Sequence, residues 1–120
     1  MEIEELMRLH NSLCDRAYTI MKAKNKDYTA GGGVFANFDL SASLGVPREL
    51  GLLVRVSDKV IRLKSGITGG ALAVKGEGFE DTILDVINYM VLLAGMSKEA
   101  RTDEKDLDLE GPGVPRSGVD

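Results

Sequence analysis

The segment from Glu77 to about Met96 constrains this chain most, because it sets an acidic row on a helix that is otherwise almost entirely apolar. At helical spacing Glu77, Asp81 and Asp85 follow one another four residues apart, and Asn88 sits about one turn beyond Asp85. Like charges at this spacing repel by roughly 0.2–0.5 kcal/mol per pair on an exposed helix. An acidic row that faces protein therefore needs cations, either a metal such as Mg²⁺ or Arg and Lys side chains from a neighbouring helix.

Two further long helices are predicted from apolar residues that recur three or four positions apart, over residues 3–24 and from Pro47 to about residue 64. A short helix over 39–44 ends at Gly45, and Ser65-Gly66 is expected to close the second long helix. No stretch alternates as a strand does. The sequence predicts an all-α fold, an antiparallel helical bundle of three long helices plus one short helix.

The connections carry most of the glycine. Three consecutive glycines, 31–33, predict a Gly-rich loop after the first helix, which Phe35 and Phe38 are expected to anchor to the core. After residue 100 the chain is mostly charged and then contains Gly and Pro. We therefore expect a single helical domain over 1–100 and a flexible acidic C-terminal tail over 101–120.

Composition narrows the class of protein. A net charge of −4 argues against a partner that is a nucleic acid polymer, because no basic excess is present to displace counterions. No segment predicts a membrane span or a signal peptide, so no membrane partner is expected and the cytoplasm is the expected compartment, that of the host cell if the protein is phage-encoded. The single cysteine, Cys14, lies on the apolar face of the first helix and is expected to be a buried, inert thiol.

The core is predicted to be thin and aliphatic. Hydrophobic residues make up 43% of the chain, but only 5% of it is aromatic and Trp is absent. Three main helices with such a core leave an apolar face to cover, which predicts a homo-oligomer.

The polar residues of the two later helices suggest a site between them. Mg²⁺ prefers oxygen ligands and leaves positions for phosphate and water, so carboxylates one turn apart with one from a facing helix suit it. Arg or Lys nearby can then clamp a phosphate. The candidate catalytic and metal-binding residues are Asp58, Glu77, Asp81 and Asp85; the candidate phosphate contacts are Arg55, Lys59 and Arg62, with Asn88 beside them.

The loop offers weaker candidates for contacts to a base or sugar. These are Lys26, Asp27 and Tyr28 before the glycines and Asn37 after them. A plainer interpretation stays open for both groups of residues. Lys26 and Asp27 can form a solvated turn and Asn37 can cap a helix, while Arg55 or Arg62 can neutralise Asp81 or Asp85 in a bundle without any ligand.

Four segments together resemble a known family. They are Lys24-Asn25-Lys26-Asp27-Tyr28; Phe35-Ala36-Asn37-Phe38; Leu53-Val54-Arg55-Val56-Ser57-Asp58-Lys59-Val60-Ile61-Arg62-Leu63; and residues 74–89, which contain Glu80-Asp81-Thr82, Asp85 and Asn88-Tyr89. The resemblance is to the nucleotide-modification-associated domain family of phages and prophages, often labelled MazG-like, and it covers about residues 22–96.

The resemblance implies an all-α fold related to the helical nucleoside triphosphate pyrophosphohydrolases, which use Mg²⁺ and usually form dimers or tetramers. Their metal motifs are Glu-Glu-x-x-Glu on one helix and Glu-x-x-Asp on the next. This chain has only Asp58 in place of the first motif, and Thr82 three positions before Asp85 in the second.

Three functions are consistent with these sequence patterns and with the resemblance. The first is Mg²⁺-dependent hydrolysis of a nucleoside triphosphate, or a modified nucleotide, to a monophosphate and pyrophosphate. The second is a non-catalytic protein that sequesters a nucleotide, for example a signal of host defence, in the same groove. The third is a helical assembly module without a ligand.

Overall fold

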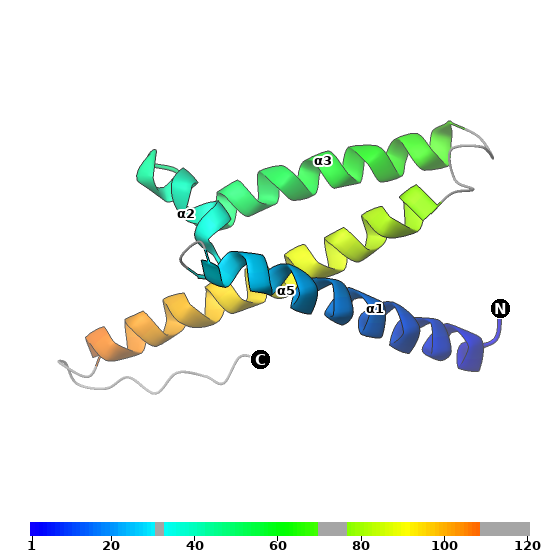
Figure 1. The fold of residues 1–120 in the computed structure, drawn as a ribbon, viewed down its shortest axis with the longest axis horizontal. Helices are drawn as coiled ribbons and strands as arrows, with labels where there is room; N and C mark the ends of the chain where they lie inside the picture. The colour runs from blue at the N-terminus through cyan, green and yellow to red at the C-terminus, as the bar shows by residue number, and fades with distance from the viewer. Residues whose placement is uncertain (31–32, 70–76, 109–120) are drawn as a thin grey trace.

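The chain folds as helices throughout the part described by the computed structural model, which covers residues 1–30, 33–69 and 77–108, without the side chains of 26–30, 77 and 103–108. Within these ranges it has four helices and no strand (Figure 1). They are α1 (Ile3–Ala30), α2 (Ala36–Ser43), α3 (Arg48–Thr68) and α5 (Glu77–Asp108). The all-α prediction is confirmed. None of these helices is both long and apolar enough to cross a membrane.

Helix α1 is longer than predicted. The prediction ended it at Lys24 and began a loop at Asn25, but the helix continues to Ala30. That prediction is wrong because no residue between Lys24 and Ala30 breaks a helix, and the first glycine is Gly31. The extension turns Asn25 into a residue of the α1 surface.

Helices α3 and α5 also extend beyond their predicted ends. Ser65-Gly66 does not close α3, which continues to Thr68 with Gly66 buried. Helix α5 continues past Met96, near which it was predicted to end, to Asp108, so the first eight residues of the predicted tail are helical. Residues 97–108 contain Lys, Glu, Arg and Ala, which are good helix formers, so charge alone did not mark the end of the helix. Residues 109–120 lie outside the described ranges.

The three long helices cross rather than run side by side along their whole length. Helices α3 and α5 are antiparallel neighbours, as predicted, and α1 crosses α5 near its middle (Figure 1). At the crossing the side-chain amide of Asn88 donates a hydrogen bond of 3.0 Å to the carbonyl oxygen of Ala17. Ala17 is a buried residue. The first half of α1 then diverges from α5.

The core lies where α2, α3 and α5 meet. Phe38, Leu52 and Met96 are buried there, and Phe35 and Tyr89 pack against them among other partly buried residues. The expected anchoring by Phe35 and Phe38 is therefore confirmed.

Helix α2 reaches this core through close contact with α3. It ends before Gly45, whose φ of +88° favours glycine, as predicted for the end of the short helix. A Cβ added at Gly51 of α3 would collide with the side chain of Ser41. Arg48 ties the region together with ion pairs to Glu99 of α5 and Asp39 of α2. Its hydrogen bond to Glu99 raises the pKa of Arg48.

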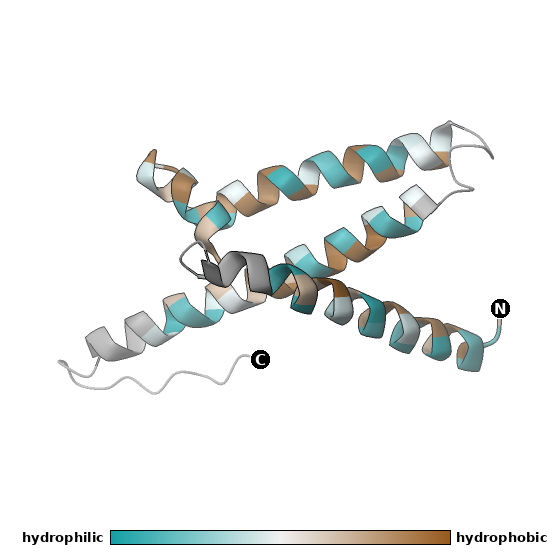
Figure 2. Ribbon diagram, viewed as in Figure 1, coloured by the Kyte–Doolittle hydropathy of each residue, from teal (hydrophilic) through white to brown (hydrophobic). Residues whose placement is uncertain are grey.

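The core of one chain is small. Among the described residues, five hydrophobic side chains are buried and 18 large hydrophobic side chains are exposed, so most of the apolar surface of the helices is not covered within the chain (Figure 2). Cys14 is among the exposed residues, so the prediction of a buried thiol is wrong for the single chain. The reason is the divergence of α1 from α5, which leaves Cys14 beside an open apolar groove between the two helices.

Candidate functional site

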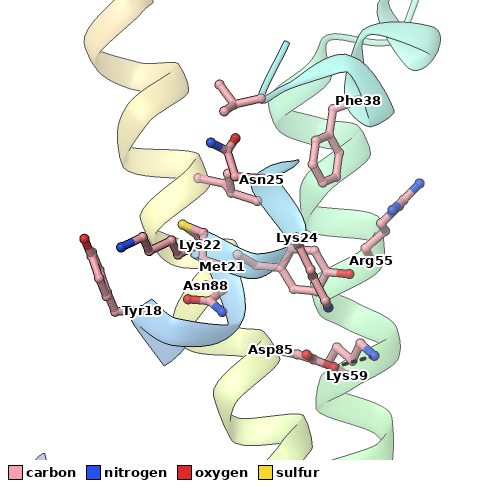
Figure 3. A pocket seen from close by; sticks show the side chains of 13 residues that line it. Tyr18, Met21, Lys22, Lys24, Asn25, Phe38, Arg55, Lys59, Asp85 and Asn88 are labelled. Carbon is pink, nitrogen blue, oxygen red and sulfur yellow. Dashed lines mark ion pairs between the residues drawn. The ribbon is translucent and has the colours of Figure 1, made fainter. Parts of the chain in front are cut away.

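A cavity of about 440 Å³ lies where α1 passes over α3 and α5 (Figure 3). This volume is in the range of small-molecule sites. Helix α1 forms one wall, α3 and α5 form the others, and Phe38 of α2 closes one end. The lining residues are Tyr18, Met21, Lys22, Lys24, Asn25, Val34, Phe38, Arg55, Lys59, Asp85, Asn88, Tyr89 and Leu92.

Helical spacing places the polar groups on the walls. Arg55 and Lys59 are one turn apart on α3, and Asp85 and Asn88 are about one turn apart on α5. Because α3 and α5 are antiparallel neighbours, these two pairs meet across the cavity. The predicted facing of the two polar stripes is confirmed for Lys59 and Asp85, which form an ion pair, while Arg55 and Asn88 line the same cavity.

The two stripes are joined by one ion pair. Lys59 Nζ lies 2.9 Å from Asp85 Oδ2, and the side chains are 18% and 31% exposed. The neutralising cation on the acidic row is thus Lys59, where the ligand-free interpretation had named Arg55 or Arg62. An ion pair screened from most of the solvent is coupled more strongly than a surface pair, so Asp85 is held in place by Lys59.

The cavity is positive in an acidic protein. Among the described side chains, Lys22, Lys24, Arg55 and Lys59 line it and Asp85 is the one carboxylate, an excess of three formal positive charges, whereas the whole chain carries −4. Figure 3 shows Lys24 reaching from α1 toward the α3 side. Clustered like charge in a concave site attracts a ligand of the opposite sign, so the cavity suits an anion.

Aromatic rings form the apolar part of the site. Phe38 and Tyr89 meet edge to face, with ring centroids 6.4 Å apart and planes at 82°. The guanidinium of Arg55 lies over the Phe38 ring, 5.0 Å from its centroid. The site therefore offers a flat apolar surface directly beside cations.

Two amides provide the remaining specific groups. The amide nitrogen of Asn88 donates a hydrogen bond to the carbonyl oxygen of Ala17, so its side-chain oxygen can accept a hydrogen bond from a ligand. The Oδ1 atom of Asn25 is buried and has no hydrogen-bond partner within the described part of the chain. A buried acceptor without a partner costs stability, so a donor from a bound molecule is a favourable partner for it.

Several predicted site residues lie elsewhere. Asp58 and Arg62 are exposed on α3 and Asn37 is exposed on α2, and none of the three lines the cavity. Asp81 lies in a shallow groove beside Asp15 and other residues of α1. The remaining candidates, Lys26, Asp27, Tyr28 and Glu77, have side chains outside the described residues.

The predicted magnesium site is not assembled by the described side chains. Asp58, Asp81 and Asp85 lie at three separate places, and no group of three or more His, Cys, Asp or Glu residues gathers in the described part of the chain. The carboxylate at the cavity is already paired with Lys59. These residues do not fit a Mg²⁺ ion as they stand, and because the side chain of Glu77 is not described, the magnesium site stays a prediction.

The α1 wall was missed by sequence reasoning. Lys22 and Lys24 are not among the site residues predicted from the sequence, and Asn25 was expected to begin a loop. The available signal was spacing, because Tyr18, Met21, Lys22 and Asn25 recur at i, i+3, i+4 and i+7 and so share one face of a helix that continues past Lys24.

Comparison with protein-family models, curated proteins and solved structures found no match to this chain. The resemblance to the nucleotide-modification-associated domain family therefore stays a prediction based on its four segments.

Proposed function

We propose that this protein binds a nucleotide in the cavity between α1, α3 and α5. The observation that carries the proposal is the positive lining of this cavity in a chain of net charge −4. Phosphates are the anionic part of a nucleotide, and Lys22, Lys24 and Arg55 supply cations that form no ion pair with Asp81 or Asp85 among the described side chains.

The rest of the lining suits the base and sugar. A base has a flat face, and Phe38, Tyr89 and Tyr18 provide rings on which such a face can pack. Amide groups such as Asn25 and Asn88 can pair with the polar edge of a base or with ribose hydroxyls. The resemblance of four segments to a nucleotide-handling family favours this class of ligand over other small anions.

Binding without hydrolysis is the form of the proposal that the geometry supports best. Asp85 is neutralised by Lys59, and the other described carboxylates do not converge on the cavity. A protein of this kind sequesters its nucleotide, and withdrawal of a nucleotide signal from host defence is one role that fits the phage resemblance.

Mg²⁺-dependent hydrolysis to a monophosphate and pyrophosphate is the second candidate. It is favoured by Asp85, the one carboxylate that the described residues place on the cavity wall, which lies on the same acidic row as Glu77 and Asp81. Under this candidate the catalytic acids are those predicted from the sequence.

Calorimetric titration and thermal denaturation with nucleoside mono-, di- and triphosphates, with and without Mg²⁺, test the proposal. A nucleotide at 100 times its Kd should stabilise the fold by about 2.7 kcal/mol, which corresponds to a rise in Tm on the order of 10 °C. Inorganic phosphate is the control for charge alone. No shift with any nucleotide in the panel would refute the proposal.

Two matched pairs of variants locate the site and separate the candidates. Arg55→Gln should weaken binding by roughly tenfold or more, whereas Arg62→Gln, two turns further along α3 and outside the cavity, should leave it unchanged. Release of pyrophosphate on addition of Mg²⁺, abolished by both Asp81→Asn and Asp85→Asn, would establish hydrolysis. Binding without release, with Asp81→Asn unchanged, would establish sequestration.

A further inference from the structure

The cavity between α1, α3 and α5 has a charged end and an apolar end. Lys59 and Asp85 form their ion pair at the charged end. Arg55 is one turn away from Lys59 on α3, and its guanidinium lies over the ring of Phe38, so Phe38 marks the opposite end. Figure 3 shows Asn25 at the same end as Phe38, away from the ion pair.

Asn25 reaches the apolar end because α1 continues past the point where it crosses α5. At the crossing Ala17 accepts the hydrogen bond of Asn88, and Asn25 follows eight residues later, about 12 Å further along the helix. Val34 and Phe38, which follow α1 in the chain, line the cavity together with Asn25. The amide of Asn25 is therefore separated from Asp85 and Asn88 by much of the length of the cavity.

The side-chain oxygen Oδ1 of Asn25 needs a hydrogen-bond donor that the described residues do not supply. It is buried and has no partner among them. Lys22 and Lys24 are close in sequence, yet neither donates to this oxygen, and Lys24 extends toward α3 instead (Figure 3). An acceptor buried without a partner costs stability, so a donor from a bound molecule gains more here than at an exposed amide.

We infer that Asn25 recognises the base of the bound nucleotide, and that this base carries an exocyclic amine, as adenine and cytosine do. The inference rests on the proposed function and adds the class of base to it. With the phosphates held by the cations near Lys59, the base lies toward Phe38, and the group of the base farthest from the sugar lies nearest Asn25. In adenine and cytosine this group is an amine, which can donate to Oδ1, whereas guanine and uracil have a carbonyl there, which cannot.

The surroundings of Asn25 suit adenine in particular. The amide of an Asn side chain can pair with adenine at two points, because its oxygen accepts from the amine while its nitrogen donates to a ring nitrogen. Phe38 and Tyr89 meet edge to face at this end of the cavity and offer ring surfaces for the flat base. An adenine nucleotide is therefore the probe of choice.

Calorimetric titration of the whole protein with three purine nucleotides tests the inference. The ligands are the 5′-monophosphates of adenosine, of inosine, which has a carbonyl in place of the amine, and of purine riboside, which has neither group. Adenosine monophosphate should bind at least about tenfold more tightly than the other two, because a buried polar group rejects an analogue that leaves it unpaired. Equal affinities, or tighter binding of the inosine nucleotide, would overturn the inference and leave the proposed function standing. Absence of binding by every nucleotide would refute both.

A matched pair of variants assigns the discrimination to Asn25. Asn25→Leu removes the amide at similar volume, so the affinity for adenosine monophosphate should fall to that for the purine riboside nucleotide. The Tm of the unliganded protein should not fall, because a buried acceptor without a partner is removed, whereas loss of an amide that only supports the fold would lower it. Asn11→Leu, at an exposed position of the same helix outside the cavity, is the control and should leave both affinities unchanged.

The ratio of the affinities decides the role of Asn25. If Asn25→Leu weakened all three nucleotides by the same factor, or left the preference for the amine intact, Asn25 would not recognise the base. The comparison of the three ligands on the wild-type protein does not depend on how well the variant folds.

Discussion

The two sides of α5 differ in how far a single chain satisfies them. On the polar side, Asp85 is paired with Lys59, and Asn88 is hydrogen-bonded to α1. On the apolar side, Met90 and Val91 remain exposed, and an open apolar groove is lined by Ile83, Val86 and Ile87. The two polar side chains, a carboxylate and an amide, are paired within the chain, whereas the exposed apolar side chains are not covered by it. This difference shows that the single chain satisfies the polar side of α5, which forms the cavity wall, but does not bury its apolar side.

Substitution on the border between the two sides should have the largest effect on stability. Leu84 is 1% exposed, so Leu84→Ala should lower the free energy of unfolding by about 2–5 kcal/mol through lost burial and a residual cavity. Urea denaturation at low and high protein concentration measures it, and the loss should be the same at both.

Met90→Ala is the matched substitution on the apolar side. Met90 is 39% exposed in the single chain, so the cost should be well below that of Leu84→Ala at low concentration, and it should grow at high concentration if the homo-oligomer predicted from the sequence buries this side chain. A cost independent of concentration would mean that no second copy covers this side.

Loss of the ion pair between Lys59 and Asp85 should have the next largest effect on stability. Lys59→Met should lower stability by about 1–3 kcal/mol, less than for a fully buried pair because both side chains keep some contact with water. Adding Asp85→Asn should restore part of the loss, and a double-mutant cycle gives the coupling energy. A cycle that sums to zero would contradict the view that Lys59 neutralises the acidic row.

The hydrogen bond at the helix crossing should matter somewhat less. Asn88→Ala removes the donor to Ala17, whose carbonyl is on a buried residue, and should cost about 1 kcal/mol. Thermal unfolding measures it. If stability were unchanged while nucleotide affinity fell, Asn88 would act as a ligand contact rather than as a tie between α1 and α5.

Asp81→Asn should have the smallest effect. Asp81 is exposed and belongs to a row of like charges, so its neutralisation should change stability by no more than about 0.5 kcal/mol and in the stabilising direction. A loss above about 1 kcal/mol would show that Asp81 holds α1 through a contact in the groove it shares with Asp15 and Arg16.

Much of the local structure could be predicted from the sequence because it depends on local physics. Periodicity located the three long helices, and Gly45 marked the end of α2, although α2 begins at Ala36 rather than at the predicted Asp39. The ends of α1, α3 and α5 were placed too early, since charged residues and a single buried glycine were read as breaks that helices tolerate.

The candidate site was only half predictable. Arg55, Lys59, Asp85 and Asn88 were found because their spacing places them on single faces of α3 and α5. Asp58, Arg62 and Asp81 have similar spacing but point elsewhere, and the wall supplied by α1 was missed, because which face of a helix meets which neighbour depends on the crossing angle between helices.

The sequence by itself therefore determined the helical character of the chain, its polar and apolar stripes and its lack of basic excess, since these depend on residue type and period. Only the tertiary structure decided that Lys59 neutralises Asp85, that Lys24 and Asn25 join the cavity, and that the apolar band of α5 is left open. The physical reason is that stripes are local, whereas the partner of each stripe is set by where α1 crosses α5, a long-range contact that no local pattern encodes.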